Sequence, residues 1–152
     1  MVSLGEALAG TIIRCNPGAL LLFGELGAGK TTLTRGLVNA LPGGDEAEAS
    51  SPSFTICNIY CTAPLVHHFD LYRLEPGTPD DALAESFDAE SVLTIVEWPE
   101  HMAARDAPED GLACRLTVGR NRQARDAEFM TLGPKGGHFL QLFFSEHPLY
   151  QG

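Results

Sequence analysis

The organisation of this chain follows from residues 24–31, which read Gly24-Glu25-Leu26-Gly27-Ala28-Gly29-Lys30-Thr31. The spacing of the glycines, the lysine and the threonine is typical of a phosphate-binding loop. Glycine permits the positive φ angles that turn several backbone N–H groups toward one anion. The lysine can reach the β- and γ-phosphates as a point charge, and the threonine hydroxyl can bind Mg²⁺. The loop therefore predicts a site for a nucleoside triphosphate.

The residues on either side of the loop predict a strand before it and a helix after it. Residues 19–23 form a short apolar run, as expected of a buried parallel strand. After the loop, Leu33, Leu37 and Leu41 recur every fourth residue, which is a helical stripe. We therefore expect an α/β fold of the P-loop NTPase type: a three-layer sandwich with a central mixed sheet and helices on both faces, forming a single domain over residues 1–152.

The remaining elements are predicted from local patterns. Further strands are expected at residues 56–61, 65–70, 92–96, 112–118 and 127–132, and the first two of these form an antiparallel hairpin. Two further helices are expected, one with Ser3 as its N-terminal cap and one capped by Thr78 with Pro79 at its first position. Residues 139–144 fit either a helix or a strand.

Two carboxylates, Asp70 and Glu97, each stand at the end of a predicted strand. Ligands of α/β sheets bind at the carboxyl ends of the strands. Phosphoryl transfer with Mg²⁺ needs an acidic residue near the metal and a group that positions the attacking water. The candidate catalytic residues are therefore Asp70, Glu97 and Lys30. The candidate metal ligands are Thr31, Asp70 and Glu97. Which carboxylate is the main ligand stays open, and the alternative for each is a solvated turn residue.

Composition restricts the class of protein. The net charge of −10 opposes direct binding to DNA, RNA or an anionic membrane. No apolar run is long enough to cross a bilayer, and the first residues do not resemble a signal peptide, so we expect a cytoplasmic protein. The four cysteines are scattered, and a zinc site at Cys57 and Cys61 is disfavoured because an extended strand would hold their sulfurs about 13 Å apart.

Four motifs occur in the order found in one known family. They are the phosphate-binding loop, residues 51–55 (Ser-Pro-Ser-Phe-Thr), residues 68–73 (His-Phe-Asp-Leu-Tyr-Arg) and residues 96–100 (Val-Glu-Trp-Pro-Glu). Together they resemble the TsaE family, also called YjeE, whose members are bacterial ATPases required for threonylcarbamoyladenosine modification of tRNA. The resemblance runs from about Leu4 to Leu132. Serine stands at position 53 where the family usually has threonine, which keeps the hydroxyl.

The resemblance implies a nucleotide site for ATP or ADP with Mg²⁺. The residues it implies are Gly24, Glu25, Leu26, Gly27, Ala28, Gly29, Lys30, Thr31 and Thr32 in the loop, and Thr55, Trp98, Ala124 and Arg125 outside it. By the same resemblance Thr31 binds Mg²⁺, Glu97 is the metal-associated glutamate, and Asp70 lies near the γ-phosphate. Thr55 belongs to a segment that senses the nucleotide, Trp98 lies beside the active site, and Arg125 stacks on adenine. The alternatives are a half-buried core aromatic for Trp98 and a solvated arginine for Arg125.

The resemblance also implies partners. TsaB and TsaD homologues would form a complex with this chain, and tRNA would be met through them. The chain starts several residues short of the family's usual N-terminus, where a segment lines the base pocket, so either the start lies further upstream or base binding differs. Two other functions remain open from the loop alone: a small-molecule kinase, and an adaptor that binds nucleotide without hydrolysing it.

Overall fold

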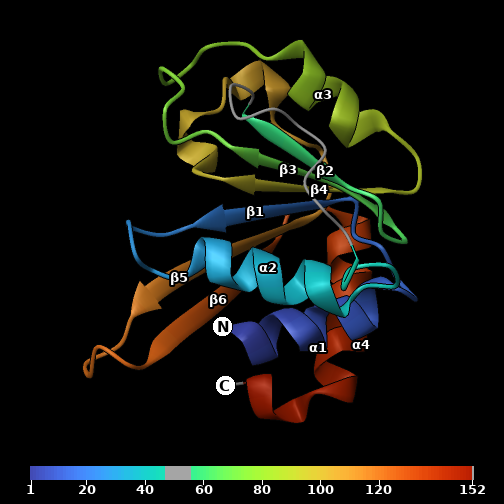
Figure 1. Ribbon diagram of the computed structural model, residues 1–152, viewed down its shortest axis with the longest axis vertical. Coiled ribbons are helices and arrows are strands. Elements are labelled where there is room, and N and C mark those ends of the chain that lie inside the picture. The colour runs from blue at the N-terminus through green and yellow to red at the C-terminus, as the bar shows by residue number, and fades with distance from the viewer. Residues whose placement is uncertain (47–55, 152) are drawn as a thin grey trace.

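A mixed sheet runs through the centre of the computed structural model, which describes residues 1–46 and 56–151 (Figure 1). Its strand order is β2-β3-β4-β1-β5-β6. The strands are β1 (Ala19–Phe23), β2 (Cys57–Tyr60), β3 (Leu65–Asp70), β4 (Val92–Glu97), β5 (Leu112–Val118) and β6 (Arg125–Thr131). The four inner strands are parallel, and the edge strands β2 and β6 pair antiparallel with β3 and β5. The strand before the loop, β1, is therefore central.

Helices cover both faces of this sheet, which confirms the predicted three-layer α/β sandwich. On one face lie α1 (Val2–Ile12), α2 (Lys30–Ala40) and α4 (Pro134–Glu146). On the other face lies α3 (Asp81–Asp88), and the chain continues after β4 through the short 3₁₀ helices Pro99–His101 and Ala104–Asp106. A last 3₁₀ turn, Pro148–Tyr150, follows α4.

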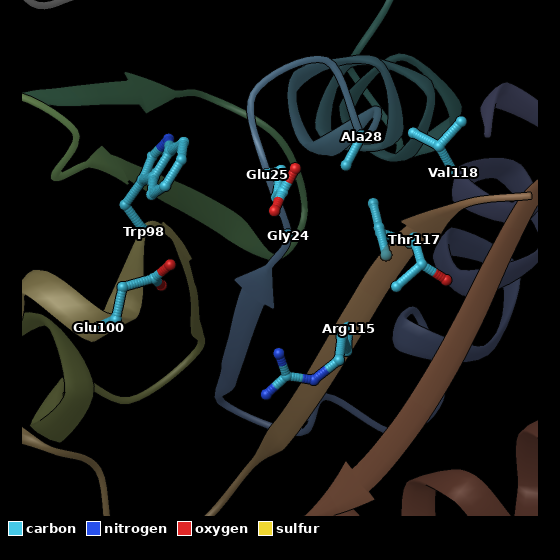
Figure 2. Close-up of a pocket in the computed structure, with 9 residues that line it drawn as sticks. Gly24, Glu25, Ala28, Trp98, Glu100, Arg115, Thr117 and Val118 are labelled. Atoms are coloured by element: carbon cyan, nitrogen blue, oxygen red, sulfur yellow. The ribbon is translucent and has the colours of Figure 1, made fainter. Parts of the chain in front are cut away.

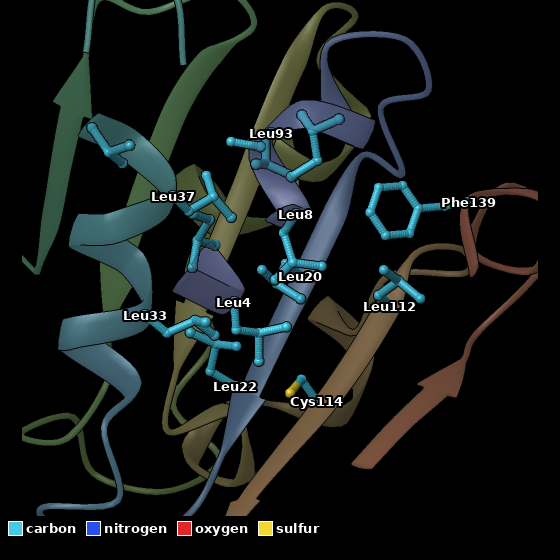
Figure 3. Packing of buried hydrophobic residues seen from close by; sticks show 14 of the residues in the cluster. Leu4, Leu8, Leu20, Leu22, Leu33, Leu37, Leu93, Leu112, Cys114 and Phe139 are labelled. Atoms are coloured by element: carbon cyan, nitrogen blue, oxygen red, sulfur yellow. The ribbon is translucent and has the colours of Figure 1, made fainter. Parts of the chain in front are cut away.

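The alternation of side chains along β1 divides the core into two layers. Leu20 and Leu22 face the α1, α2 and α4 layer and are no more than 2% exposed (Figure 3). Leu21 between them faces the α3 layer. Each such leucine contributes about 1.5–3 kcal/mol by leaving water. Because both faces of β1 are buried, this strand reads as a continuous apolar run.

Helices α1 and α2 approach each other closely through two glycines. A Cβ on Gly5 would lie 2.6 Å from the backbone oxygen of Leu33, and one on Gly36 would lie 2.9 Å from the backbone of Val2. Side chains at these positions would push the helices apart. The contact fixes α1 against the helix that begins at the phosphate-binding loop.

The predicted strands are confirmed, with ends that differ by at most two residues, but two helix starts are wrong. Helix α1 begins at Val2 with Met1 as its cap, so Ser3 lies inside the first turn. Helix α3 begins at Asp81, because the side chain of Asp80 accepts a hydrogen bond from the backbone N–H of Leu83 at 3.1 Å. The Thr78 hydroxyl instead donates to the backbone of the preceding turn. Residues 139–144 belong to a helix, α4.

Candidate nucleotide site

The predicted phosphate-binding loop joins the carboxyl end of β1 to the N-terminus of α2. Gly24 has a φ of 145°, and a Cβ there would lie 2.6 Å from the backbone oxygen of Leu116 in the neighbouring strand. Gly29 has a φ of 107° and forms the cap of α2. The helix therefore starts with unpaired backbone N–H groups that point at the loop, and such a helix end attracts anions.

A small pocket of about 170 Å³ beside the loop brings most of the predicted residues together. It is lined by loop and helix residues Leu26, Gly27, Gly29, Lys30, Thr31 and Thr32, and by Asp70, Tyr72, Glu97 and Trp98. The outer residues come from the carboxyl ends of β3 and β4, which pair in parallel with Asp70 opposite Glu97. Thr55 lies outside the described residues.

Lys30 is held by the loop itself. Its side chain is buried, and its ammonium group donates to the backbone oxygens of Gly24 and of Glu25, the latter at 3.0 Å. The same group lies 4.1 Å from the centre of the Trp98 ring, a cation–π contact. Burial lowers the pKa of Lys30, while the charges of nearby carboxylates, Glu97 foremost, oppose that effect. The ammonium group of Lys30 thus lies against the loop, and the lysine lines the pocket.

Glu97 is 2% exposed, yet its carboxylate is paired at both oxygens. Oε2 accepts a hydrogen bond from the Thr31 hydroxyl at 3.0 Å, and Oε1 accepts one from Nε2 of His68 at 2.9 Å. Burial alone would raise the pKa of Glu97, but the hydrogen bond and charge of His68, the hydrogen bond of Thr31 and the charge of Lys30 together hold it below the ordinary 4.5. Glu97 is therefore an ionised carboxylate in contact with the loop threonine.

Asp70 differs from Glu97 in its surroundings. It is exposed, and its Oδ1 accepts a hydrogen bond from the backbone N–H of Tyr72 at 3.1 Å. One oxygen of this carboxylate, Oδ2, is not used by any hydrogen bond among the described residues. Asp70 can therefore contact a ligand or a water molecule in the pocket.

Trp98 lines both the phosphate pocket and a larger pocket of about 440 Å³, and Figure 2 shows the larger one. Its backbone has a φ of 59°, a strained value for a residue with a large side chain, and its ring lies 4.9 Å from that of Tyr72. The larger pocket is lined by Arg115 and the residues that follow it in β5, and by Glu25 and Glu100 (Figure 2). Trp98 thus touches both pockets from a fixed position.

Ala124 and Arg125 lie in the turn before β6 and at its first residue. A guanidinium nitrogen of Arg125 lies 3.5 Å from the backbone oxygen of Gly27, so this arginine reaches the tip of the loop. Its other contacts are to backbone oxygens of its own turn. Ala124 donates its backbone N–H to the side chain of Asn121 at 2.8 Å, which shapes the turn.

Three residues of this site were given no role in the sequence analysis: His68; Tyr72, which lines the phosphate pocket; and Thr34, whose hydroxyl donates to the backbone of Lys30 at 3.0 Å. His68 stood inside the quoted motif of residues 68–73, but only its neighbour Asp70 received a role. The period of two in a strand was the available signal, since it puts His68 and Asp70 on the same face of β3.

The site combines a strand, a glycine-rich loop and a helix, and a buried carboxylate from a neighbouring strand is bonded to the loop threonine. This arrangement defines a P-loop nucleotide-binding protein. The family described as "Threonylcarbamoyl adenosine biosynthesis protein TsaE" matches residues 1–127. TsaE of Bacillus subtilis is 35% identical over 128 residues, covering 83% of this chain and 76% of that protein. TsaE of Streptomyces coelicolor is 37% identical over 139 residues, covering 87% and 88%.

The fold agrees with these similarities. A crystal structure of YdiB from Bacillus subtilis has a TM-score of 0.72 to this chain at 27% identity, and the match covers 97% of this chain and 91% of that one. The chain therefore belongs to the TsaE family, the tRNA threonylcarbamoyladenosine biosynthesis proteins. Across the described residues, no helix has the length and apolar character needed to span a membrane.

Proposed function

We propose that the protein is a Mg²⁺-dependent ATPase that serves the threonylcarbamoyladenosine modification of tRNA. The hydrogen bond between Thr31 and Glu97 carries the proposal. It joins the threonine of a phosphate-binding loop to an ionised carboxylate at the end of the neighbouring strand. Loops of this type bind nucleoside triphosphates together with a magnesium ion held by the threonine and an acidic residue.

The donor atoms fit magnesium. Mg²⁺ prefers oxygen ligands in an octahedron with bonds of about 2.1 Å, in which neighbouring oxygens are about 3 Å apart. Thr31 Oγ1 and Glu97 Oε2 lie 3.0 Å apart. The two oxygens are therefore suited to hold the ion, directly or through one of its water molecules. A bound Mg²⁺ would neutralise charge on the β- and γ-phosphates.

The other side chains would divide the remaining work. Lys30 would exchange the backbone oxygens of Gly24 and Glu25 for phosphate oxygens, because an ammonium binds an anion more strongly than a neutral carbonyl. Asp70 would orient the attacking water with its exposed carboxylate. Among the described residues that line the phosphate pocket, Lys30 is the only lysine or arginine. We therefore expect slow hydrolysis by the isolated chain, and stimulation by a partner.

The names of the relatives support the biological setting. They are called tRNA threonylcarbamoyladenosine biosynthesis proteins. We expect homologues of TsaB and TsaD to be the partners, in the cytoplasm, and tRNA to be met through them. The net charge of −10 supports this indirect contact.

The test measures release of ADP and phosphate from Mg²⁺-ATP by the protein alone and with TsaB, TsaD and unmodified tRNA. Stimulated release is the expected result, and omission of Mg²⁺ should abolish it. Phosphate found on a metabolite would identify a kinase instead. Bound but unchanged ATP in the full mixture would identify a nucleotide-binding adaptor.

A further inference from the structure

His68 lies in the layer between the sheet and α2, on the same side of the sheet as Glu97. Its side chain is 7% exposed, and it pairs with Ile95, two strand positions before the pair formed by Asp70 and Glu97. The adjacent His67 points to the other side of the sheet, where Nδ1 contacts the Ser86 hydroxyl at 2.8 Å. The two histidines therefore have different environments although they are neighbours in the chain.

The chemistry of Glu97 determines how His68 bonds to it. An ionised carboxylate only accepts hydrogen bonds, so Nε2 of His68 must carry the hydrogen in the 2.9 Å contact with Oε1. Within the described residues, Nδ1 of His68 is buried without a hydrogen-bond partner. The imidazole of His68 therefore makes its hydrogen bond through Nε2 alone, and the acceptor of that bond is Glu97.

Without His68, the Oε1 atom would keep only a marginal contact. The Thr34 hydroxyl lies 3.5 Å from Oε1, at the limit of a hydrogen bond. A buried carboxylate with one unpaired oxygen gains by rotating or by admitting water. Either movement would take Oε2 away from the Thr31 hydroxyl and separate the two oxygens that now lie 3.0 Å apart.

We propose that His68 is a positioning residue for the metal site: its Nε2–H holds Oε1 of Glu97, so that Oε2 stays beside Thr31 where Mg²⁺ binds. This inference rests on the proposed function, since it assumes that Thr31 and Glu97 hold the ion. Residues that orient metal ligands in this way affect metal affinity by about 10–100-fold when they are replaced.

The experiment compares His68→Gln with His68→Asn, two variants that carry the same amide group on side chains of different length. The longer glutamine amide can reach the position of Nε2, whereas the asparagine amide is too short. ATP affinity is measured by titration calorimetry with Mg²⁺ and with a chelator, and the ratio gives the Mg²⁺ enhancement. We expect His68→Asn to reduce the enhancement at least tenfold and His68→Gln to retain most of it, with chelator affinities unchanged.

Repeating the measurement in a Glu97→Gln protein distinguishes a positioning role of His68 from a general loss of structure. In Glu97→Gln protein, exchanging His68 for asparagine should reduce the Mg²⁺ enhancement no further, because both changes act through one carboxylate. His67→Asn is the matched control and should leave the enhancement intact. Circular dichroism and thermal melting check that each variant is folded.

The outcomes separate this inference from the function on which it rests. If Mg²⁺ does not enhance ATP binding by the unaltered protein, the proposed function fails. If it does, and His68→Asn matches the unaltered protein or His68→Gln loses as much as His68→Asn, the role of His68 is overturned. Additive losses in the Glu97→Gln background would also overturn it.

Discussion

The ammonium group of Lys30 is bound by the backbone of its own loop. A buried ammonium group needs partners, and here the backbone oxygens of Gly24 and Glu25 supply them. The loop is therefore bound to its own lysine in the form that a phosphate group would contact. Under the proposed function, phosphate oxygens would replace these backbone oxygens as the partners of Lys30.

Replacing Lys30 by alanine should weaken ATP binding by about ten- to a hundredfold, because a hydrogen bond to a charged group contributes about 1.5–3 kcal/mol. Titration calorimetry with Mg²⁺-ATP measures the loss. Arg35→Ala is the matched control, since it removes one exposed positive charge from the same helix. Equal affinities for Lys30→Ala and the unaltered protein would contradict the whole phosphate site.

Glu97→Gln should impair Mg²⁺-dependent hydrolysis by at least tenfold and change stability less. The amide keeps the shape of the side chain, and its oxygen can still accept a hydrogen bond, but it lacks the charge that holds a cation. Phosphate release with the partners present measures the first effect, and urea unfolding measures the second. A variant that unfolds would mean that Glu97 serves the fold rather than the chemistry.

At the scale of the elements, two glycines of α1 give a matched pair. A Cβ on Gly5 would meet the backbone of α2 at 2.6 Å, whereas one on Gly10 would meet nothing within 4 Å. We expect Gly5→Ala to destabilise by about 1–3 kcal/mol, because backbone atoms cannot move aside. Gly10→Ala should stabilise by up to about 1 kcal/mol, because alanine favours a helix. Equal effects in urea unfolding would refute the close packing of α1 on α2.

Asp110 caps α4 from outside the helix. Its carboxylate accepts hydrogen bonds from the backbone N–H groups of Lys135 at 3.0 Å and Gly136 at 3.1 Å. Burial alone would raise the pKa of Asp110, but these bonds, one from Gly111 and the charge of Lys135 hold it below the ordinary 3.8. Because the folded state lowers this pKa, the stabilisation is present above pH 3.8 and is lost as pH falls below it.

Asp110→Ala should therefore destabilise by about 1 kcal/mol at pH 7, the usual value of a helix cap. The difference in the free energy of unfolding between this variant and the unaltered protein should shrink as the pH falls below 3.8. Urea unfolding at several pH values measures it. Glu109→Ala is the control: it removes an exposed neighbouring charge and should have little effect on stability. If the stability lost in Asp110→Ala is the same at every pH, the ionised carboxylate does not cap the helix.

These elements also show where a sequence is informative. The strand 112–118 was predicted with its observed ends, because its apolar residues and the turns around it are local signals. The start of α3 was predicted too early, because two possible caps lie close together and tertiary contacts select Asp80, whose N–H donates to Asp106 at 2.8 Å. The contact of His68 with Glu97 joins residues 29 positions apart, so it required the register of β3 on β4.

At the scale of the whole molecule, positive charge is scarce and unevenly placed. The chain carries ten lysines and arginines against twenty acidic residues. Three of the ten, Arg120, Arg122 and Arg125, lie in and beside the turn between β5 and β6, and Arg125 contacts the loop. Attraction between this turn and a polyanion competes with the repulsion of the remaining surface, and the response to salt distinguishes the two.

We expect the isolated protein to bind tRNA more weakly than the usual nonspecific range of about 10⁻⁴–10⁻⁶ M. Repulsion between a net charge of −10 and the phosphates is screened by salt, so residual binding should not weaken as salt rises. Fluorescence anisotropy of labelled tRNA at several salt concentrations measures this. Binding that weakens steeply with salt would instead indicate direct phosphate contacts. The double variant Arg120→Ser with Arg122→Ser would then show whether this turn makes those contacts, because each lost phosphate contact reduces the salt slope by about one.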